Sequence, residues 1–307
     1  MNAKVNETSS MKSSKLWRSL LKEYYHNIND KFISYFREPN KKINRFTTNR
    51  PPKEPTYRYY LTILFNEIRK QKCYFFNNYR KLGNTNLGRP LGIVYDDLKI
   101  NFDYLISLYE YDFISQNIKL NKIRSVVEIG AGFGRTAHTL LKLQPNIKSY
   151  TIIDLPPILK ISKVYLQKVI PDSISKINFI SAYNIKEWKQ IKSELAINID
   201  SFQEMPKCTI KEYLKNLFSN INYVYIKNPV CKYDPKLLGI NSSRKFDVFS
   251  LGLMKEIVNI YNEKKLIKIR KVYNKRYCPS NKHKIIKSLP CNLYPYYQNT
   301  LYKKKTN

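Results

Sequence analysis

The sequence predicts an α/β protein with a doubly wound, mostly parallel sheet and a helical N-terminal extension. From about residue 121 onward, short apolar segments rich in β-branched residues alternate with helical segments, as they do in strand-helix-strand units. Before that point, apolar residues recur at three- and four-residue spacing, which is typical of amphipathic helices. We therefore expect a helical region at residues 1–120, which caps a site or mediates oligomerisation, and an α/β domain at residues 121–307.

The N-terminal region contains two helical segments separated by a glycine-rich loop. Residues 56–82 and residues 96–115 carry apolar side chains with helical periodicity. Between them, residues 83–92 hold three glycines and a proline, which predicts a loop. This loop either closes over a binding site or is an ordinary connection.

The α/β domain alternates five predicted strands with four predicted helices. The strands are expected at residues 125–129, 149–154, 177–182, 194–200 and 222–227. The helices are expected at residues 135–143, 156–169, 186–192 and 209–220. This alternation predicts a parallel sheet covered on both faces, with ligands bound beyond the carboxyl ends of the strands. Farther along the chain we expect a helix at residues 253–265 and an edge strand at residues 299–305, whose lysines discourage further pairing.

The charge of the chain is strongly positive. Its 307 residues include 55 Lys and Arg against 23 Asp and Glu, a formal net charge of +32. Such a charge favours nucleic acid as a partner, or an acidic polysaccharide or anionic membrane surface bound through the basic C-terminal part. Joint enrichment of residues encoded by AT-rich codons explains the charge equally well. Because no apolar leader or membrane-length apolar run is present, we expect a soluble cytoplasmic protein.

A dense cluster of glycines follows the first predicted strand. Gly130, Gly132 and Gly134 separate that strand from a helix beginning near Arg135. Glycine lets the backbone turn sharply and approach a ligand, and the helix offers unpaired N–H groups. The third glycine comes one place too early for the dinucleotide fingerprint, which disfavours NAD. Glu128, two places before the first glycine, suits a cationic ligand better than a pyrophosphate.

These residues, E-x-G-x-G-x-G at 128–134, resemble motif I of the class I S-adenosylmethionine-dependent methyltransferases, a Rossmann-like fold. The resemblance implies that the loop and Glu128 hold the methionine part of S-adenosyl-L-methionine. It implies that Asp154, which ends the second strand, holds the ribose, and that Ser181 and Tyr183 contact the adenine. The alternative for Asp154 is a solvated acid or a helix N-cap.

A narrower resemblance covers about residues 83–228. "VVEIGAGFGRTAHTLLKLQPNIKSYTIIDLPPIL" and "LAINIDSFQEMP" look like segments of the bacterial sugar O-methyltransferases. This resemblance implies methyl transfer to a sugar hydroxyl in the biosynthesis of a surface polysaccharide or another glycan. Two departures are Arg135, where the family often has a small residue, and the first eighty residues, which match no motif.

The acceptor side is expected after the fourth and fifth strands. A sugar hydroxyl is a poor nucleophile, so a base within hydrogen-bond reach assists its attack. The candidate catalytic residues are Asp200, Glu204 and His138, and the candidate substrate-binding residues are Ser201, Gln203, Asn228 and Arg89. The alternatives are that Asp200 caps a turn, that Glu204 is solvated and that His138 faces a neighbouring helix. The acid and Asp-Asn pattern of metal-dependent O-methyltransferases is missing, so we expect no metal.

Two other function classes stay open on the sequence. The positive charge and the basic, tyrosine-containing C-terminal part favour a nucleic-acid methyltransferase or a basic nucleic-acid-binding protein. The residues "DSFQ" after the fourth strand, however, differ from the motif with which amino-methylating DNA enzymes clamp a flipped base. A non-enzymatic protein on a decayed fold is the third class, and the intact Glu128, glycines and Asp154 argue against it.

Overall fold

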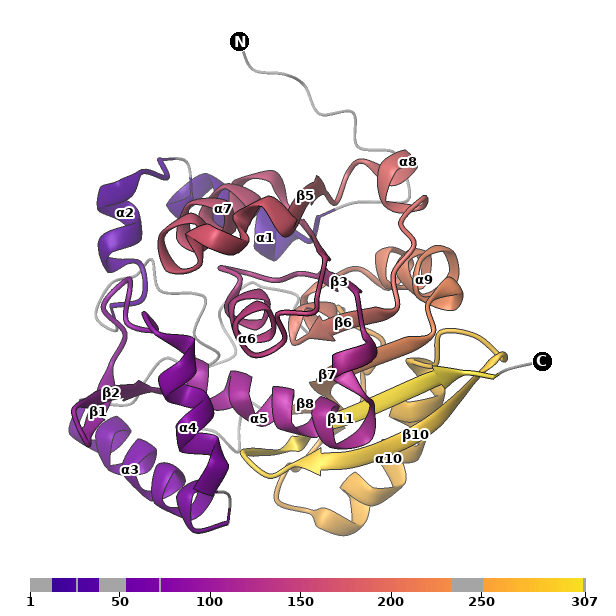
Figure 1. Cartoon of the computed structure of the whole chain (residues 1–307). Coiled ribbons are helices and arrows are strands. Elements are labelled where there is room, and N and C mark those ends of the chain that lie inside the picture. The colour runs from indigo at the N-terminus through magenta and orange to yellow at the C-terminus, as the bar shows by residue number, and fades with distance from the viewer. Residues whose placement is uncertain (1–12, 26, 39–53, 72, 234–250, 306–307) are drawn as a thin grey trace.

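A seven-stranded sheet forms the centre of the computed structural model, which describes residues 13–25, 27–38, 54–71, 73–233 and 251–305 (Figure 1). The strand order is β10-β11-β7-β6-β3-β4-β5. The strands are β3 (Ser125–Ile129), β4 (Ser149–Asp154), β5 (Ile177–Ser181), β6 (Leu195–Ile199), β7 (Tyr223–Pro229), β10 (His283–Cys291) and β11 (Tyr294–Lys304). Strands β3 to β7 are parallel, whereas β11 is antiparallel to both of its neighbours. This doubly wound, mostly parallel sheet confirms the predicted fold class.

Helices cover both faces of the sheet, as the alternation predicts. They are α6 (Arg135–Leu143), α7 (Pro156–Val169), α8 (Ile185–Trp188), α9 (Lys207–Asn216) and α10 (Glu263–Arg276). Successive strand residues point to opposite faces, so Val126 joins the apolar cluster beneath α6 and α7, and Val127 joins the cluster beneath α8 to α10. The chain reverses its direction of winding beside β3. This places the switch point, where doubly wound sheets bind ligands, at the carboxyl end of β3.

The N-terminal region packs onto the face that carries α6 and α7. It consists of α1 (Lys15–Tyr24), α2 (Asp30–Tyr35), α3 (Glu54–Gln71), α4 (Cys73–Leu82), β1 (Gly92–Tyr95), β2 (Leu98–Asn101) and α5 (Phe102–Asn117). Its buried side chains, among them Leu20, Phe36 and Leu61, belong to the same apolar cluster as residues of β3 and β4. The helical extension therefore shares its core with the sheet.

The buried side chain of Arg37 contacts both the glycine-rich loop at residues 83–92 and the glycine-rich turn at residues 130–134. The guanidinium of Arg37 pairs with Asp103 at 2.8 Å and donates to the carbonyl oxygens of Thr85 at 2.9 Å and Leu87 at 3.0 Å. It also lies 4.8 Å from the ring centre of Phe133, between Gly132 and Gly134. The loop at 83–92 thus serves as a fixed support rather than only a connection.

Two expected helices begin later along the chain than the sequence predicts. The helix expected at 253–265 begins only at Glu263, because Ile257–Val258 (β9) pairs with Lys232–Tyr233 (β8) and the Asn262 side chain accepts from Lys265 N–H as an N-cap. The helix expected from residue 96 begins at Phe102 for the same kind of reason, since β2 pairs with β1.

The strand expected at the edge is interior. Strand β11 lies between β7 and β10, so β10 forms that edge of the sheet.

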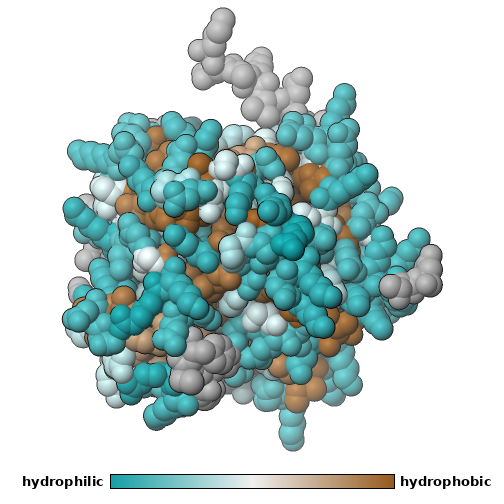
Figure 2. All heavy atoms as spheres, viewed as in Figure 1, coloured by the Kyte–Doolittle hydropathy of each residue, from teal (hydrophilic) through white to brown (hydrophobic). Residues whose placement is uncertain are grey.

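The expected helix at 56–82 is divided into α3 and α4, and residue 72 between them lies outside the described residues. Figure 2 shows hydrophilic side chains over most of one face, with apolar groups exposed between them. Within the described part of the chain, no helix is long and apolar enough to cross a membrane.

Candidate functional site

The glycine-rich turn at residues 130–134 and Asp154 contact each other at the ends of β3 and β4. Gly132 N–H donates to Asp154 Oδ2 at 3.1 Å, and Leu155 N–H donates to Asp154 Oδ1 at 2.7 Å. The backbone of Gly130 has a φ of 72°, and a Cβ placed there would lie 2.2 Å from Ser201 Oγ. Only glycine fits this turn, which brings the ends of β3, β4 and β6 together.

Burial changes the protonation of the two acids that flank the turn. It raises the pKa of Asp154 to about 7, against the opposing effect of the Leu155 and Gly132 N–H groups. It also raises the pKa of Glu128 to about 7, although Tyr150 Oη donates to this carboxyl group at 2.7 Å. Glu128 lies on β3 beneath the turn, so its contact with a ligand stays a prediction.

Asp200 follows β6 in a left-handed conformation, with a φ of 65°. Its N–H donates to the carbonyl of Lys227 at 2.8 Å, and its side chain accepts from Tyr297 Oη at 2.6 Å and from the Gln203 side-chain amide. Burial raises the pKa of Asp200, while Tyr297 and Lys227 oppose that effect. Sequence reasoning missed Tyr297, because it comes from β11 and nothing distinguishes it among 26 tyrosines.

Glu204 lies at the end of the short 3-10 turn Ser201–Glu204 and accepts from Trp17 Nε1 at 2.9 Å. Burial and the charge of Asp200 raise the pKa of Glu204 to about 7, and Trp17 and Lys232 oppose this. Asp154 also acts electrostatically on Glu204. The predicted cofactor acid and the predicted acceptor acids therefore lie at the carboxyl ends of β4 and β6, on either side of the turn that contacts Ser201. Trp17 was missed, because it lies in α1, a segment without a motif.

Ser201 and Asn228 form a chain of hydrogen bonds that supports the site from below. Ser201 Oγ donates to the carbonyl of Ile129 at 3.1 Å and accepts from Asn198 Nδ2 at 2.6 Å. Asn228 Nδ2 donates to Asn198 Oδ1 at 2.8 Å, and Asn228 Oδ1 accepts from Gln203 N–H at 3.3 Å. These contacts give Ser201 and Asn228 a role in positioning the turn after β6.

Two other predicted residues, His138 and Arg89, lie away from these acids. His138 is 0% exposed, and its ring contacts the carbonyl of Leu82 at 2.9 Å and the Tyr104 hydroxyl. Burial lowers its pKa to about 4, so the structure gives His138 a neutral framework role and does not bring it to the acids. Arg89 is exposed at the tip of the loop at 83–92.

Ser181 pairs in register with Asp154 at the ends of β5 and β4. Its side chain accepts from Tyr183 N–H at 3.2 Å, so both residues of the predicted adenine side border the site. Their contact with a ligand stays a prediction. Within the described part of the chain, no group of three His, Cys, Asp or Glu side chains has the arrangement of a metal site.

A buried ionic cluster lies beneath the turn. Glu110 pairs with Arg135 at 2.9 Å and with Lys227 Nζ at 2.7 Å. Burial alone would raise the pKa of Glu110, but the two cations outweigh it and the pKa is lowered. Arg135, the departure from the family pattern, is therefore an ion-pair partner of a residue on α5.

No family model matches this chain, and no curated protein matches it. The methyltransferase domain of bacterial CtHen1-C is similar at 14% identity and a TM-score of 0.44, over 66% of this chain and 98% of that one. Mitomycin 7-O-methyltransferase MmcR is similar at 14% and 0.43, over 65% of this chain and 54% of its own. Human N-acetylserotonin methyltransferase is similar at 11% and 0.41, over 78% and 69%. This chain spans about half the length of the mitomycin enzyme, and similarities this weak carry no conclusion about function.

Proposed function

We propose that this protein is an S-adenosylmethionine-dependent O-methyltransferase whose acceptor is a sugar hydroxyl of a glycan or surface-polysaccharide precursor. The observation that carries the proposal is the single site formed by the glycine-rich turn, Asp154, Asp200 and Glu204. The glycines give the turn a left-handed backbone at the carboxyl end of β3, and Asp154 beside it offers carboxylate oxygens to ribose hydroxyls. When bound, the cofactor supplies a methyl group on a positively charged sulfur.

The acids after β6 suit the handling of one proton. Methyl transfer is an in-line displacement, so the protein aligns the acceptor oxygen and removes its proton. A base works best when its pKa is near the working pH, and the pKa of Glu204 is raised to about 7. Glu204 takes the proton of the hydroxyl, and Asp200, held by Tyr297 and Gln203, orients the acceptor.

The geometry speaks against a base-flipping nucleic-acid enzyme. Such enzymes stack the extruded base on an accessible aromatic side chain. The aromatic residue after β6 is Phe202, which is 0% exposed and stacks on Tyr277 and Tyr213 in the core beneath α9. It is therefore not available to a base.

Transfer from labelled S-adenosylmethionine to polysaccharide precursors of the host tests this function. We expect Glu204→Gln to reduce the rate by about 10²–10⁴-fold, with Asp200→Asn also impaired. Glu67→Gln, on an exposed surface of α3, serves as the matched control and should retain full rate. Undiminished transfer in both site variants would contradict the assignment of the acids, and absence of cofactor binding by calorimetry would contradict the activity itself.

A further inference from the structure

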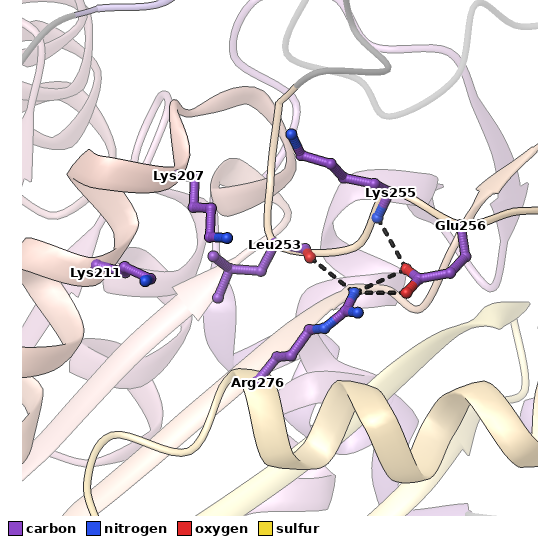
Figure 3. Close-up of a pocket in the computed structure, with 6 residues that line it drawn as sticks. All are labelled: Lys207, Lys211, Leu253, Lys255, Glu256 and Arg276. Atoms are coloured by element: carbon purple, nitrogen blue, oxygen red, sulfur yellow. Dashed lines mark hydrogen bonds and ion pairs between the residues drawn. The ribbon is translucent and has the colours of Figure 1, made fainter.

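A pocket of about 400 Å³ lies between α9, the start of the segment that leads to α10, and the end of α10 (Figure 3). It is lined by Lys207, Lys211, Leu253, Lys255, Glu256 and Arg276. Four of these six side chains are cationic and one is anionic. The pocket is therefore strongly positive and has one apolar wall.

The cations of this pocket divide into one fixed group and three exposed ones. Arg276 pairs with Glu256 at 2.7 Å and donates to the carbonyl of Leu253 at 3.1 Å, so its position is set by the protein. Lys207 and Lys211 lie one turn apart on α9, and Lys255 approaches from the facing segment. Within the described residues, none of these three lysines has an ion-pair partner. The pocket thus carries excess positive charge that the described protein groups leave unbalanced.

The pocket adjoins the acceptor side of the candidate site. Lys207 comes three residues after Glu204, so their Cα atoms are at most about 11 Å apart. Gly252 N–H donates to the carbonyl of Met205 at 2.9 Å, which holds the segment before Leu253 against the turn that carries Glu204. The pocket and the turn that carries Glu204 are therefore neighbours, joined by this backbone hydrogen bond.

We infer that this pocket binds the phosphoryl groups of an acceptor whose sugar hydroxyl lies at Glu204. Each phosphoryl group offers several acceptor oxygens and up to two negative charges, which match three lysines better than a single carboxylate does. The uncapped N-terminus of α9, where Pro206 provides no side-chain hydrogen bond, adds a favourable dipole. A compact pocket with an apolar wall fits a diphosphate-linked sugar better than a long polyanion. This inference rests on the proposed function, since it names the substrate class of the same site.

Calorimetric titration of the full chain with inorganic pyrophosphate tests the pocket. We expect one site, with affinity reduced about tenfold in Lys207→Gln/Lys211→Gln. The control is Lys264→Gln/Lys268→Gln, which removes two exposed lysines at the same spacing from the other half of α10 and should bind as the wild type does. Equal losses in both double variants, or several equivalent sites, would show general charge attraction and overturn the inference.

The cofactor is titrated separately into the same variants. If S-adenosylmethionine binds but pyrophosphate does not, the proposed phosphoryl site is wrong and the proposed function stands. If pyrophosphate binds but S-adenosylmethionine does not, the proposed function is wrong and the anion site stands. Transfer to a nucleoside diphosphate sugar and to a polyprenyl diphosphate sugar in detergent then distinguishes the source of the phosphoryl groups. We expect the lysine double variant to raise KM with little change in kcat for the productive acceptor. Tighter binding of a single-stranded oligonucleotide than of either diphosphate sugar would overturn the inference in favour of a nucleic-acid surface.

Discussion

Two groups of acids near the carboxyl ends of the strands are stabilised in opposite ways, and Glu110 is buried whereas Asp154 and Glu204 are half-buried. Glu110, beneath the sheet edge, contacts Arg135 and Lys227, and its pKa is lowered. Asp154 and Glu204, at the edge itself, accept from backbone or indole N–H groups, and the pKa of each is raised to about 7. The first group is electrostatically complete within the protein. The second is easily protonated and ready for a ligand that brings hydroxyl groups or positive charge.

The type of partner, cationic or neutral, distinguishes an acid that stabilises the fold from an acid that can bind a ligand more clearly than burial does. A buried carboxylate with two cationic partners maintains the fold, and removing it leaves unpaired charges. A half-buried carboxylate held by neutral donors contributes little to the fold at neutral pH, because its charged form is disfavoured there. We therefore expect substitutions in the two groups to affect stability in opposite directions.

The largest effect is expected at the ionic cluster. Glu110→Gln leaves Arg135 and Lys227 without their carboxylate, and we expect a loss of about 3–5 kcal/mol in the free energy of unfolding, measured by urea denaturation. Glu67→Gln breaks the exposed pair with Lys70 and should cost less than about 1 kcal/mol. A loss at Glu110 as small as that at Glu67 would remove the distinction between the two groups of acids.

The second-largest effect is expected at Gly130, in the turn next to Asp154. Gly130→Ala combines a left-handed φ with a Cβ that would overlap Ser201, so we expect a loss of about 2–4 kcal/mol and weaker cofactor binding. Gly83 has nearly the same φ, 73°, and nothing within 4 Å of its Cβ position. Gly83→Ala should therefore cost only about 1 kcal/mol, and thermal unfolding of the two variants isolates the steric contribution. Equal costs would mean that the turn yields to accommodate a side chain.

Replacement of Glu204, whose pKa is raised, should stabilise the protein at high pH. The folded-state pKa of Glu204, about 7, lies above the unfolded value of about 4.3. Its contribution to stability is thus complete below about pH 4.3 and is lost as the pH rises through 7. We expect Glu204→Gln to match the wild type near pH 4 and to exceed it by about 1–3 kcal/mol at pH 8, by denaturation in a pH series. If the variant is less stable than the wild type at pH 8, Glu204 stabilises the fold in its charged form, as Glu110 does.

The smallest effect is expected at the indole that contacts Glu204. Trp17→Phe keeps an aromatic ring but removes the N–H that opposes the raised pKa of Glu204. We expect the rising limb of the pH profile of kcat/KM to move to higher pH, because Glu204 then ionises later. The same substitution in a Glu204→Gln background should leave the residual profile unmoved. An unshifted profile in the single variant would assign Trp17 to packing alone.

The sequence predicts the central part of the fold closely, because local signals determine it. Strand Ser125–Ile129, the glycines after it and helix Arg135–Leu143 have the predicted bounds, since apolar alternation and glycine placement are local properties. The helix expected at 253–265 failed, because pairing of Ile257 with Lys232 overrides local periodicity. Pairing between distant strands leaves no mark in a window of adjacent residues.

The candidate site divides in the same way. Asp154 ends β4, and Asp200 and Glu204 follow β6, so all three lie at the carboxyl ends of strands as the sequence predicts, while their roles stay predictions. Trp17 and Tyr297 are distant in sequence from the acids that they contact, and neither belongs to a motif. Only the folded structure therefore reveals them. His138 has the right spacing from the glycines, but helix α6 directs its ring toward α4 and α5.

The contacts of Trp17 and Tyr297 have a consequence for synthesis. Trp17 is separated from Glu204 by 187 residues, and Tyr297 is separated from Asp200 by 97 residues. A nascent chain that has completed β3 to β7 possesses the glycine-rich turn and every acid of the site, yet the hydroxyl that holds Asp200 is still to be made. The two acids after β6 reach their final surroundings only when the last strand, β11, has left the ribosome and inserted beside β7. The hydrogen bond that Tyr297 donates to Asp200 can therefore form only after β11 has been translated, and a chain that stops before residue 297 lacks it.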